Sequence, residues 1–426
     1  VCPGAHFLAS TKAADAVYNA QVPVTAKKIR DLYYDAFFVH DHLLHFYFLA
    51  SPDFILGPEA PRDKRNVFGV VEKLGTKFGK SLLRVMKELA FVQELIGGKS
   101  THPTAFLPGG VARGLEKEEA RKIAAVFKNA VSFINNGLEM IESEIIKPYR
   151  DMILSNVYYH ETNYMGLVDN NGHVSLTDGM FRAVSPTGNE IVVFEPKDYL
   201  KHIAEHVEPW TFIKFPYLRK IGWKGLVDGE KSGIYRVGPL ARLNVSKGFS
   251  TEGAMEWYEK FYEFFETKPV HHTLAMHWAR LIETLYAAEH GLMLANDEEI
   301  LGKDLLGDVG EPKEGVGAVE APRGSLIHHY VADERGLVER VNLIVATTHN
   351  NGGICMSIKK AAEHLINKVG TENVDDGVLN KIEMAFRAYD PCLACATHTL
   401  PNQMPMEVAI YDCEGNIVKS LRRFAQ

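Results

Sequence analysis

The sequence predicts an α-rich α+β fold, in which a large helical-bundle core carries small antiparallel β pieces. Two observations predict this class. Long stretches place apolar residues three and four positions apart, which is the period of an amphipathic helix. Between some of these stretches lie short β-prone runs separated by Asn-Gly and Thr-Gly dipeptides, which are typical of hairpins. We find no internal repeat and no low-complexity segment.

The predicted helices occur in both halves of the chain. Helical spacing runs from Ser10 to about Phe48, and its latter half is apolar nearly all round, which indicates a buried helix. The Pro-rich segment 51–63 interrupts the pattern. Further helices are predicted over 70–98, 116–153, 252–294 and 378–392, and Pro391 stops the last of them.

Strands are predicted in three regions. Segment 166–196 contains turn dipeptides between short apolar runs, which favours hairpins. Segment 322–349 reads as two strands around an Arg-Gly turn, and segment 406–424 as a terminal hairpin with Glu-Gly at its turn. The β pieces are therefore small and separate.

The composition excludes several classes of protein. The 426 residues are 46% hydrophobic and 24% charged, with a net charge of −7, as in ordinary globular proteins. No basic patch of the kind that binds nucleic acid appears, and no run of about 18 uncharged apolar residues suggests a membrane span. The five cysteines are odd in number and unevenly placed. We therefore expect a cytoplasmic protein with metal or redox chemistry rather than a disulfide framework.

The pair Cys392 and Cys395, separated by two residues, carries the strongest chemical signal. Two thiolates at this spacing can converge on one soft or borderline metal ion, and His398 follows three residues later. The alternatives are two buried cysteines that act as small hydrophobes, or a zinc site that needs a second ligand pair. Cys2 with His6 provides the only other early candidate ligands.

These residues belong to a larger pattern. DPCLACATH, residues 390–398, resembles the second cysteine motif of nickel–iron hydrogenase large subunits, and CPGAH, residues 2–6, resembles the second half of the first motif. Other features of that family recur in order along nearly the whole chain: HDHLLHFYFLASPDF (40–54), VGPLARLN (237–244), EAPRG (320–324) and ATTHNN (346–351). The resemblance implies the large-subunit fold and a nickel–iron centre.

The resemblance also implies a ligand set. Cys392 corresponds to a terminal nickel ligand, and Cys2 and Cys395 to bridging ligands shared with an iron that carries carbonyl and cyanide. The remaining cysteine of the family lies two residues before Val1, so we expect that this sequence lacks the true beginning of the chain. The family cleaves dihydrogen heterolytically, between the metals and a nearby base.

Three further residues are implied to be catalytic. Arg323 corresponds to the family's arginine over the metals, and Asp41 and Asp390 to the two carboxylates that pair with it. A carboxylate in an apolar helix is costly to bury unless it is paired. The sequence therefore predicts a contact between Asp41 and Arg323.

Other roles are implied around the centre. Pro322 and Thr347 correspond to residues that line the diatomic ligands of the iron, and His6 to a histidine that hydrogen-bonds a bridging sulfur. His398 corresponds to a histidine that binds a separate magnesium or iron ion.

Several residues and one segment are expected to lie outside this chemistry. His40, His42 and His45 do not share one helix face, so we assign them packing roles. We interpret Cys355 and Cys413 as non-ligands. Residues 1–398 would form the catalytic domain, and residues 399–426 a tail of the kind that a maturation protease removes after nickel insertion.

Within the family, the sequence most resembles the methyl-viologen-reducing hydrogenases of methanogens, which do not reduce the deazaflavin cofactor. These pass electrons to heterodisulfide reductase. The chain has too few cysteines for an iron–sulfur cluster beyond the active site, so we expect its partner to be an iron–sulfur small subunit, bound across a large apolar interface. The alternatives are an NAD(P)-linked bidirectional hydrogenase, a quinone-binding or coupling subunit of a complex I-like assembly, and a zinc-stabilised structural protein.

Overall fold

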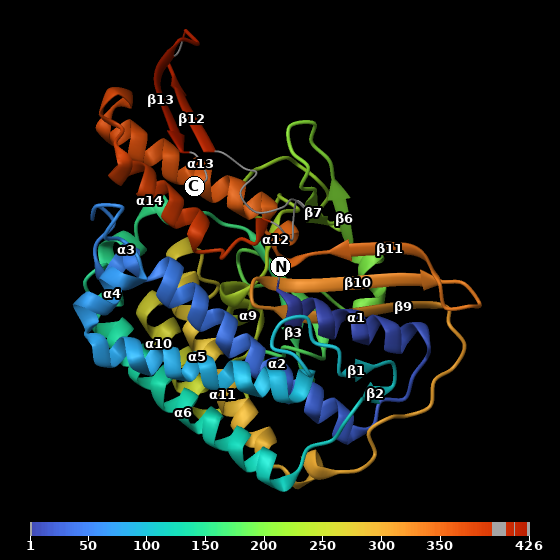
Figure 1. Ribbon diagram of the computed structural model, residues 1–426. Coiled ribbons are helices and arrows are strands. Elements are labelled where there is room, and N and C mark those ends of the chain that lie inside the picture. The colour runs from blue at the N-terminus through green and yellow to red at the C-terminus, as the bar shows by residue number, and fades with distance from the viewer. Residues whose placement is uncertain (1, 394–405, 413, 424–426) are drawn as a thin grey trace.

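The computed structural model describes residues 2–393, 406–412 and 414–423, and these form a layer of long helices beside a layer of small sheets (Figure 1). The largest hydrophobic core runs through the helical layer and continues under the sheets. Among the described residues, we find no helix with the length and apolar character that crossing a bilayer requires.

Two buried helices form the centre of the helical layer. They are α2 (Val24–Leu44) and α11 (Met276–Ala295), which pack against each other. Most residues of both helices are buried, as expected of helices that other helices surround. The helices packed around them are α5 (Thr76–Gly97), α6 (Lys117–Ile141) and α10 (Glu252–Phe265).

Shorter elements close the ends of this layer. A π-helical stretch, η1 (His45–Ala50), continues α2 directly. The others are α3 (Pro52–Ile55), α4 (Val67–Leu74), η2 (Glu142–Ile146), α7 (Arg150–Ile153), η3 (Asn156–Tyr158), η5 (Thr273–Ala275), η6 (Glu298–Leu301), β1 (Phe106–Leu107) and β2 (Gly110–Val111).

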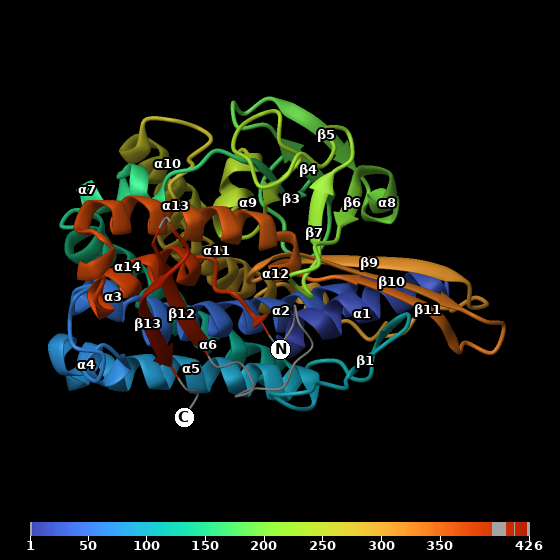
Figure 2. The same cartoon turned by 90° about the horizontal axis from the view of Figure 1, so that it is seen from above.

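A three-stranded antiparallel sheet lies beside the bundle in the order β11–β10–β9. Its strands are β9 (Glu314–Ala321), β10 (Gly324–Ala332) and β11 (Val338–Ile344). Helix α1 (Pro3–Val17) lies along β9, as Figure 2 shows. The approach is so close that a Cβ on Gly317 would lie 2.2 Å from the backbone nitrogen of Ala13.

A second sheet has the order β5–β4–β3–β8 and packs with α9 (Pro239–Val245). Its strands are β3 (Asn163–Val168), β4 (Met180–Val184), β5 (Glu190–Phe194) and β8 (Tyr235–Arg236). Nearby lie η4 (Pro196–Asp198), α8 (Tyr199–His202) and the hairpin of β6 (Ile203–His206) and β7 (Phe215–Leu218).

The last part of the chain returns to the helical layer. It contains α12 (Ala346–His349), α13 (Asn351–Val369), η7 (Thr371–Asn373), α14 (Asp376–Arg387), β12 (Met406–Tyr411) and β13 (Ile417–Arg423). The β12–β13 hairpin projects beside α13 and α14 (Figure 1). Ile410 packs there with Val378 and Leu379, which joins the hairpin to the helices.

The predicted α-rich α+β class is confirmed, and some predicted boundaries are wrong. The first helix begins at Pro3 rather than near Ser10. The single helix predicted over 252–294 is two helices, because Glu266 adopts a left-handed conformation and Pro269 cannot continue a helix. The two strands around Arg335–Gly336 and the terminal hairpin are confirmed, but β9 was not predicted.

Candidate metal centre

Arg323 lies between two carboxylates from distant parts of the chain. Its Nη1 is 3.1 Å from Asp41 Oδ1, and its Nη2 is 3.0 Å from Asp390 Oδ1. Asp41 lies near the end of α2, Arg323 in the turn between β9 and β10, and Asp390 just after α14. The predicted contact between Asp41 and Arg323 is therefore present, and all three side chains are largely shielded from solvent.

Backbone contacts fix the turn that presents Arg323. The side-chain amide of Asn350 donates to the Arg323 carbonyl at 3.1 Å. Gly238 lies so close to this turn that a Cβ added to it would be 3.0 Å from the Arg323 carbonyl oxygen. The φ of Gly238 is +95°. A residue with a side chain would be strained there. Gly238 lies in the VGPLARLN motif, so this motif supports the turn of the EAPRG motif.

Asp390 is the more deeply buried of the two carboxylates, with 3% of its side chain exposed. Burial raises its pKa to about 7, because the nearby Asp41 adds to this effect and Arg323 and Arg280 only partly oppose it. Its backbone adopts φ +53°, a conformation that is uncommon for a residue with a side chain. Asp390 can therefore hold a proton near neutral pH while it remains bonded to a cation.

Cys2 and Cys392 meet near the same guanidinium, although they lie at opposite ends of the chain. Cys2 is buried at the start of α1. Cys392 is half-buried, and its backbone N–H donates to Thr347 Oγ1 at 3.1 Å. The negative charges of Asp390, Asp41 and both thiolates raise the pKa of Arg323 against the effect of burial.

This donor set fits a soft metal centre. Thiolates are the ligands that nickel and iron–sulfur chemistry use, and a guanidinium beside them stabilises their negative charge. Two cysteines from opposite chain ends would have no packing reason to converge on a buried cation. The residues present therefore suit a thiolate-bound metal pair better than an oxygen-ligated ion.

His6 lies one turn beyond Cys2 on α1. Its Nδ1 is 3.0 Å from His328 Nε2, and His328 Nδ1 is 2.6 Å from the hydroxyl of Tyr330. The other ring nitrogen of His6, Nε2, is buried and has no hydrogen-bond partner among the described residues. A buried nitrogen without a partner is costly, so His6 Nε2 is available to a group outside the described residues.

The structure also places Pro322 and Thr347 at the centre. Pro322 directly precedes Arg323, and its carbonyl accepts a hydrogen bond from Arg242 at 3.2 Å. Thr347 is buried in α12, where its hydroxyl oxygen accepts from the Cys392 backbone. Cys395 and His398 lie outside the described residues, as does Cys413.

The three histidines of α2 and η1 point to different neighbours, as their spacing predicted. His42 Nε2 is 2.7 Å from Glu283, and His45 Nε2 donates to the Arg387 carbonyl at 3.1 Å. His40 lines a cavity of about 720 Å³ with His6, Asp41 and other residues. Ligand atoms of Asp41, His42 and Asp390 lie within 4.8 Å of one another, but Arg323 already occupies both carboxylates and would repel a cation.

Cys355, interpreted from the sequence as a non-ligand, lies on α13. Its thiol is 3.9 Å from Asn351 Oδ1, and burial raises its pKa. A thiol with a raised pKa carries little thiolate at neutral pH and is a poor metal ligand. This environment is consistent with that interpretation.

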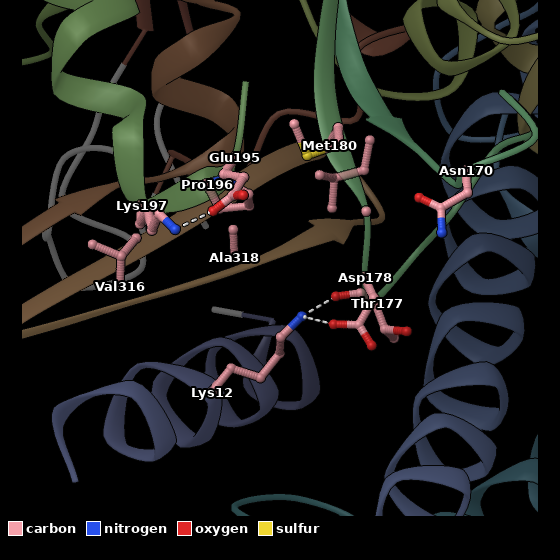
Figure 3. A pocket seen from close by; sticks show the side chains of 12 residues that line it. Lys12, Asn170, Thr177, Asp178, Met180, Glu195, Pro196, Lys197, Val316 and Ala318 are labelled. Atoms are coloured by element: carbon pink, nitrogen blue, oxygen red, sulfur yellow. Dashed lines mark hydrogen bonds and ion pairs between the residues drawn. The ribbon is translucent and has the colours of Figure 1, made fainter. Parts of the chain in front are cut away.

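A separate cavity of about 430 Å³ lies between α1, β9 and the loop before β4 (Figure 3). Lys12 reaches from α1 to Asp178 at 2.8 Å, and Lys27 to the same carboxylate at 2.6 Å. Of the described residues, none that the sequence assigned to the metal centre lines this cavity. Lys12 of α1 and Asp178 of the opposite wall form an ion pair across this cavity, so we interpret the cavity as part of the packing of α1.

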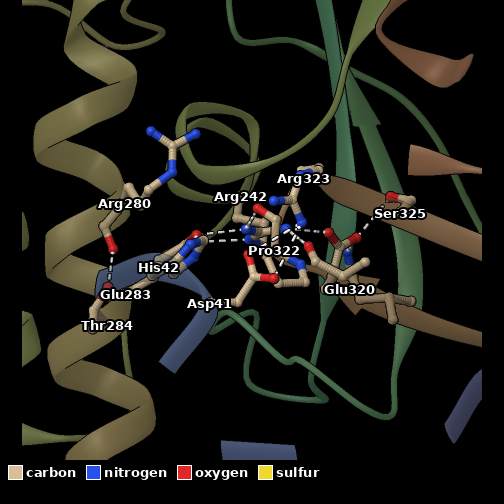
Figure 4. A network of polar contacts seen from close by, with 12 residues as sticks. Asp41, His42, Arg242, Arg280, Glu283, Thr284, Glu320, Pro322, Arg323 and Ser325 are labelled. Carbon is tan, nitrogen blue, oxygen red and sulfur yellow. Dashed lines mark hydrogen bonds and ion pairs between the residues drawn. The ribbon is translucent and has the colours of Figure 1, made fainter. Parts of the chain in front are cut away.

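The sequence reasoning missed a buried network behind the centre (Figure 4). Arg242 contacts Glu283 and Glu320, and Glu283 contacts His42. Arg242 and Glu320 lie within the VGPLARLN and EAPRG motifs. The sequence therefore singled out both positions but did not predict which residues they contact. Glu283 lies within the predicted helix 252–294, where an acidic residue among apolar neighbours was the available signal.

Comparison with known proteins agrees with this geometry. Residues 1–65 and 230–398 match the family described as nickel-dependent hydrogenase. These two matched ranges contain Cys2, Asp41, Arg323, Asp390 and Cys392.

Individual relatives match along nearly the whole chain. An iron-sulfur subunit of the F420-non-reducing hydrogenase of Archaeoglobus profundus is 44% identical over 427 residues, which cover 100% of this chain and 87% of that protein. The beta subunit of the NAD-reducing hydrogenase HoxS of Cupriavidus necator is 34% identical over 439 residues, covering 99% and 87%. A solved NAD+-reducing [NiFe]-hydrogenase in the H2-reduced state superposes with a TM-score of 0.87 at 35% identity, covering 93% and 86%.

Proposed function

This chain belongs to the nickel-dependent hydrogenase family, in which it is a catalytic large subunit. On that premise we propose that it is of the F420-non-reducing type. It would oxidise dihydrogen and pass the electrons through an iron–sulfur small subunit to a heterodisulfide reductase. The observation that supports the activity most directly is the meeting of Cys2, Cys392 and the Asp41–Arg323–Asp390 cluster at one buried point.

Thiolates of this chain would hold the nickel–iron centre. Cys392 is proposed as a terminal nickel ligand, and Cys2 and Cys395 as ligands that bridge nickel and iron. When bound, the centre supplies the two-electron chemistry that dihydrogen cleavage requires. His6 Nε2 is buried and has no hydrogen-bond partner among the described residues, and it would donate to a cysteine sulfur of the centre.

Arg323 has the task of orienting polar groups over the centre. Its guanidinium is planar and always charged, and the two carboxylates clamp it in one orientation. Such fixed donors in a water-poor site stabilise developing negative charge at little reorganisation cost. Asp390 lies 3.0 Å from this guanidinium, and its carboxyl group would exchange a proton there.

Carbonyl and cyanide on the iron are part of the proposal. Pro322 and Thr347 would line these ligands, with the Thr347 hydroxyl as a donor. Infrared bands from iron-bound carbonyl and cyanide are expected in the anaerobically purified protein, and a Thr347→Val variant should shift them. A Thr347→Val spectrum identical to that of the wild type would show that Thr347 does not line these ligands.

The activity is tested by dihydrogen-dependent reduction of methyl viologen. We expect uptake by the wild-type protein, purified anaerobically with its natural partners, and none by a Cys392→Ala variant. A Cys355→Ala variant is the matched control and should retain full uptake, because Cys355 lies on α13 and hydrogen-bonds Asn351. Full uptake by Cys392→Ala would contradict the ligand assignment.

The electron acceptor is tested separately. An NAD(P)-linked enzyme is the second candidate, because a solved NAD+-reducing hydrogenase superposes closely on this chain. The higher identity to the F420-non-reducing relative favours the first. We expect the purified complex to reduce a heterodisulfide with dihydrogen and to leave NAD+ unreduced; the reverse pattern would favour the second candidate.

The C-terminal tail and the second metal ion complete the proposal. Residues 399–426 would be a maturation peptide, and His398 would then bind a magnesium or iron ion. The β12–β13 hairpin pairs only with itself among the described strands, which is compatible with its removal. Mass spectrometry of the mature protein should show a chain that ends at His398, and an intact tail in active enzyme would contradict this part.

We also propose a cytoplasmic location for the protein.

A further inference from the structure

Arg242 of α9 lies at the centre of the buried network and has no solvent-exposed surface. Its guanidinium makes two contacts with Glu283, through Nε at 2.7 Å and Nη2 at 2.5 Å, and one with Glu320, through Nη1 at 2.7 Å. An arginine is suited to such a position because its five donors have a fixed planar arrangement. Figure 4 shows it between Glu283 on α11 and Glu320 on β9.

One side of this network holds the segment that carries Arg323. Arg242 donates to the carbonyls of Ala321 at 3.0 Å and Pro322 at 3.2 Å. Glu320 is fixed from both directions, because it also accepts from Ser325 Oγ at 2.7 Å. The two residues that precede Arg323 are therefore bound through their backbone to a single side chain.

The other side holds the part of α2 that carries Asp41. Glu283 bonds His42, the next residue along the chain from Asp41. The guanidinium of Arg242 also stacks over Phe38, at 5.5 Å from the ring centroid, and Phe38 meets the His42 ring edge to face at 4.4 Å. Asp41 is thus flanked on its helix by two residues that Arg242 contacts directly or through Glu283.

We propose that Arg242 is a positioning residue for this chemistry: it connects the α2 turn of Asp41 to the turn of Arg323 and so fixes the geometry of the ion pair between them. The inference rests on the proposed function of Arg323. It assigns Arg242 no contact with substrate or metal. A merely structural arginine would stabilise the fold without setting the orientation of Arg323.

The substitution Arg242→Lys tests the proposal. Lysine keeps the charge, but its three N–H donors all lie on one nitrogen, so it cannot hold Glu283 at two points and also reach Glu320 and two carbonyls. We expect hydrogen–deuterium exchange to become faster in peptides that cover 38–46 and 320–325. Dihydrogen uptake should fall about 10- to 100-fold at unchanged nickel content, as expected when a catalytic group moves by about an ångström.

Arg30→Lys is the matched control. Arg30 is also buried, contacts both oxygens of Asp15 and donates to the carbonyls of Leu107 and Gly110. The Arg30→Lys substitution should lower thermal stability about as much as Arg242→Lys does. It should leave hydrogen–deuterium exchange at 320–325 and dihydrogen uptake unchanged. Equal effects of the two substitutions at 320–325 would overturn the proposal.

A double substitution separates positioning from general destabilisation. In an Arg323→Lys background, Arg242→Lys should reduce the remaining uptake less than about threefold, because residues that act through one another are not additive. Losses that simply multiply would overturn the proposal. If Arg242→Lys does not fold, Glu283→Gln weakens the same link and should produce the same pattern.

Failure of the proposed function would be recognised separately. If the wild-type protein takes up no dihydrogen, the hydrogenase assignment fails, but the exchange comparison between Arg242→Lys and Arg30→Lys can still be read. Unchanged hydrogen–deuterium exchange at 320–325 in an active Arg242→Lys enzyme would contradict only the positioning role of Arg242 and would leave the hydrogenase assignment in place.

Discussion

Arg323 is a buried cation that contacts the carboxylates of Asp41 and Asp390 and feels the negative charge of the Cys2 and Cys392 thiolates. Burial away from water makes each of these interactions stronger. The same burial explains why Asp390 retains a proton to a higher pH than an ordinary aspartate, with a pKa of about 7.

The substitution Arg323→Lys should reduce dihydrogen uptake about 10²- to 10³-fold, the range found when one fixed donor is removed from an active site. The ammonium keeps the charge but cannot contact Asp41 and Asp390 in one planar arrangement. Uptake is measured at equal nickel content per chain. Arg335→Lys, in the exposed turn between β10 and β11, is the control and should change nothing.

The pair of His290 and Asp35 makes stability depend on pH. Burial opposes the charged imidazolium, but Asp35 at 2.8 Å outweighs it and raises the pKa of His290 to about 9. A raised histidine pKa stabilises the fold fully below its unfolded value near 6.5, and this contribution is lost as pH rises through about 9. Asp35, with a pKa of about 6, is ionised throughout most of this window.

We therefore expect the free energy of unfolding to fall by about 1–2 kcal/mol between pH 6.5 and 9.5 through this pair alone, after allowance for the partial exposure of His290. A His290→Gln variant should lose that part of the slope, as measured by urea unfolding at several pH values. Identical slopes for the variant and the wild type would exclude the pair as the cause.

At this scale, the sequence was informative where a motif carried the residue. The Asp41–Arg323 contact could be predicted because the family resemblance pairs these two residues, and because a carboxylate in an apolar helix needs a partner. The partners of Arg242 could not, because Glu283 and Glu320 lie far from it in the sequence and no local pattern pairs them. The burial that raises the pKa of Asp390 likewise depends on neighbours from several elements.

At the scale of elements, α1 lies so close to β9 that Gly315 and Gly317 leave no room for a Cβ. Gly317→Ala would bring a Cβ to 2.2 Å from the Ala13 nitrogen and 2.4 Å from the Ala9 carbonyl oxygen. We expect it to destabilise the protein by about 1–3 kcal/mol through overpacking. Because α1 carries Cys2 and His6, nickel content should fall as well.

Gly377→Ala is the control for this change, since the space around Gly377 on α14 accepts a Cβ with its nearest neighbour at 3.3 Å. Thermal unfolding and metal analysis of both variants test the prediction. A stable, fully nickel-loaded Gly317→Ala protein would show that α1 can move without disturbing the centre.

The docking of the β12–β13 hairpin depends on a few apolar residues. Ile410 is 8% exposed and packs with Val374, Val378 and Leu379. A two-stranded hairpin is marginally stable by itself, so Ile410→Asp in the unprocessed chain should release it. Hydrogen exchange at 406–411 and 417–423 should become fast while the helical core melts unchanged.

Val418→Asp provides the control, because Val418 is exposed on the same hairpin. Its exchange should match that of the unsubstituted chain. If Ile410→Asp leaves the hairpin protected, contacts other than the Ile410 cluster hold it on α13 and α14.

Most elements could be predicted from apolar spacing and turn dipeptides, and the errors have identifiable causes. The break between α10 and α11 was missed because apolar helical spacing resumes after Pro269, although that proline is itself a signal for a break. Strand β9 was missed because Gly315 and Gly317 give it little β-propensity; they are there to admit α1. Helix α13 was not predicted, since the ATTHNN motif reaches only its first residue, Asn351.

At the scale of the whole molecule, the centre lies where the helical layer, the β9–β10 turn and the segment after α14 meet (Figures 1 and 2). Cys2 and Cys392 come together only when the complete fold has formed. The extra loop-closure entropy for such distant residues is modest, because this cost grows only with the logarithm of loop length. The chain is therefore organised to build one centre from its two ends.

We propose that this fold assembles a nickel–iron centre held by Cys2 and Cys392 beside Arg323. The most direct test is elemental analysis of the protein purified anaerobically with its natural partners, alongside its Cys392→Ala variant. We predict nickel in an amount equal to the large subunit in the wild type and its loss in the variant. Zinc without nickel in the wild type, or unchanged nickel in the variant, would contradict the claim.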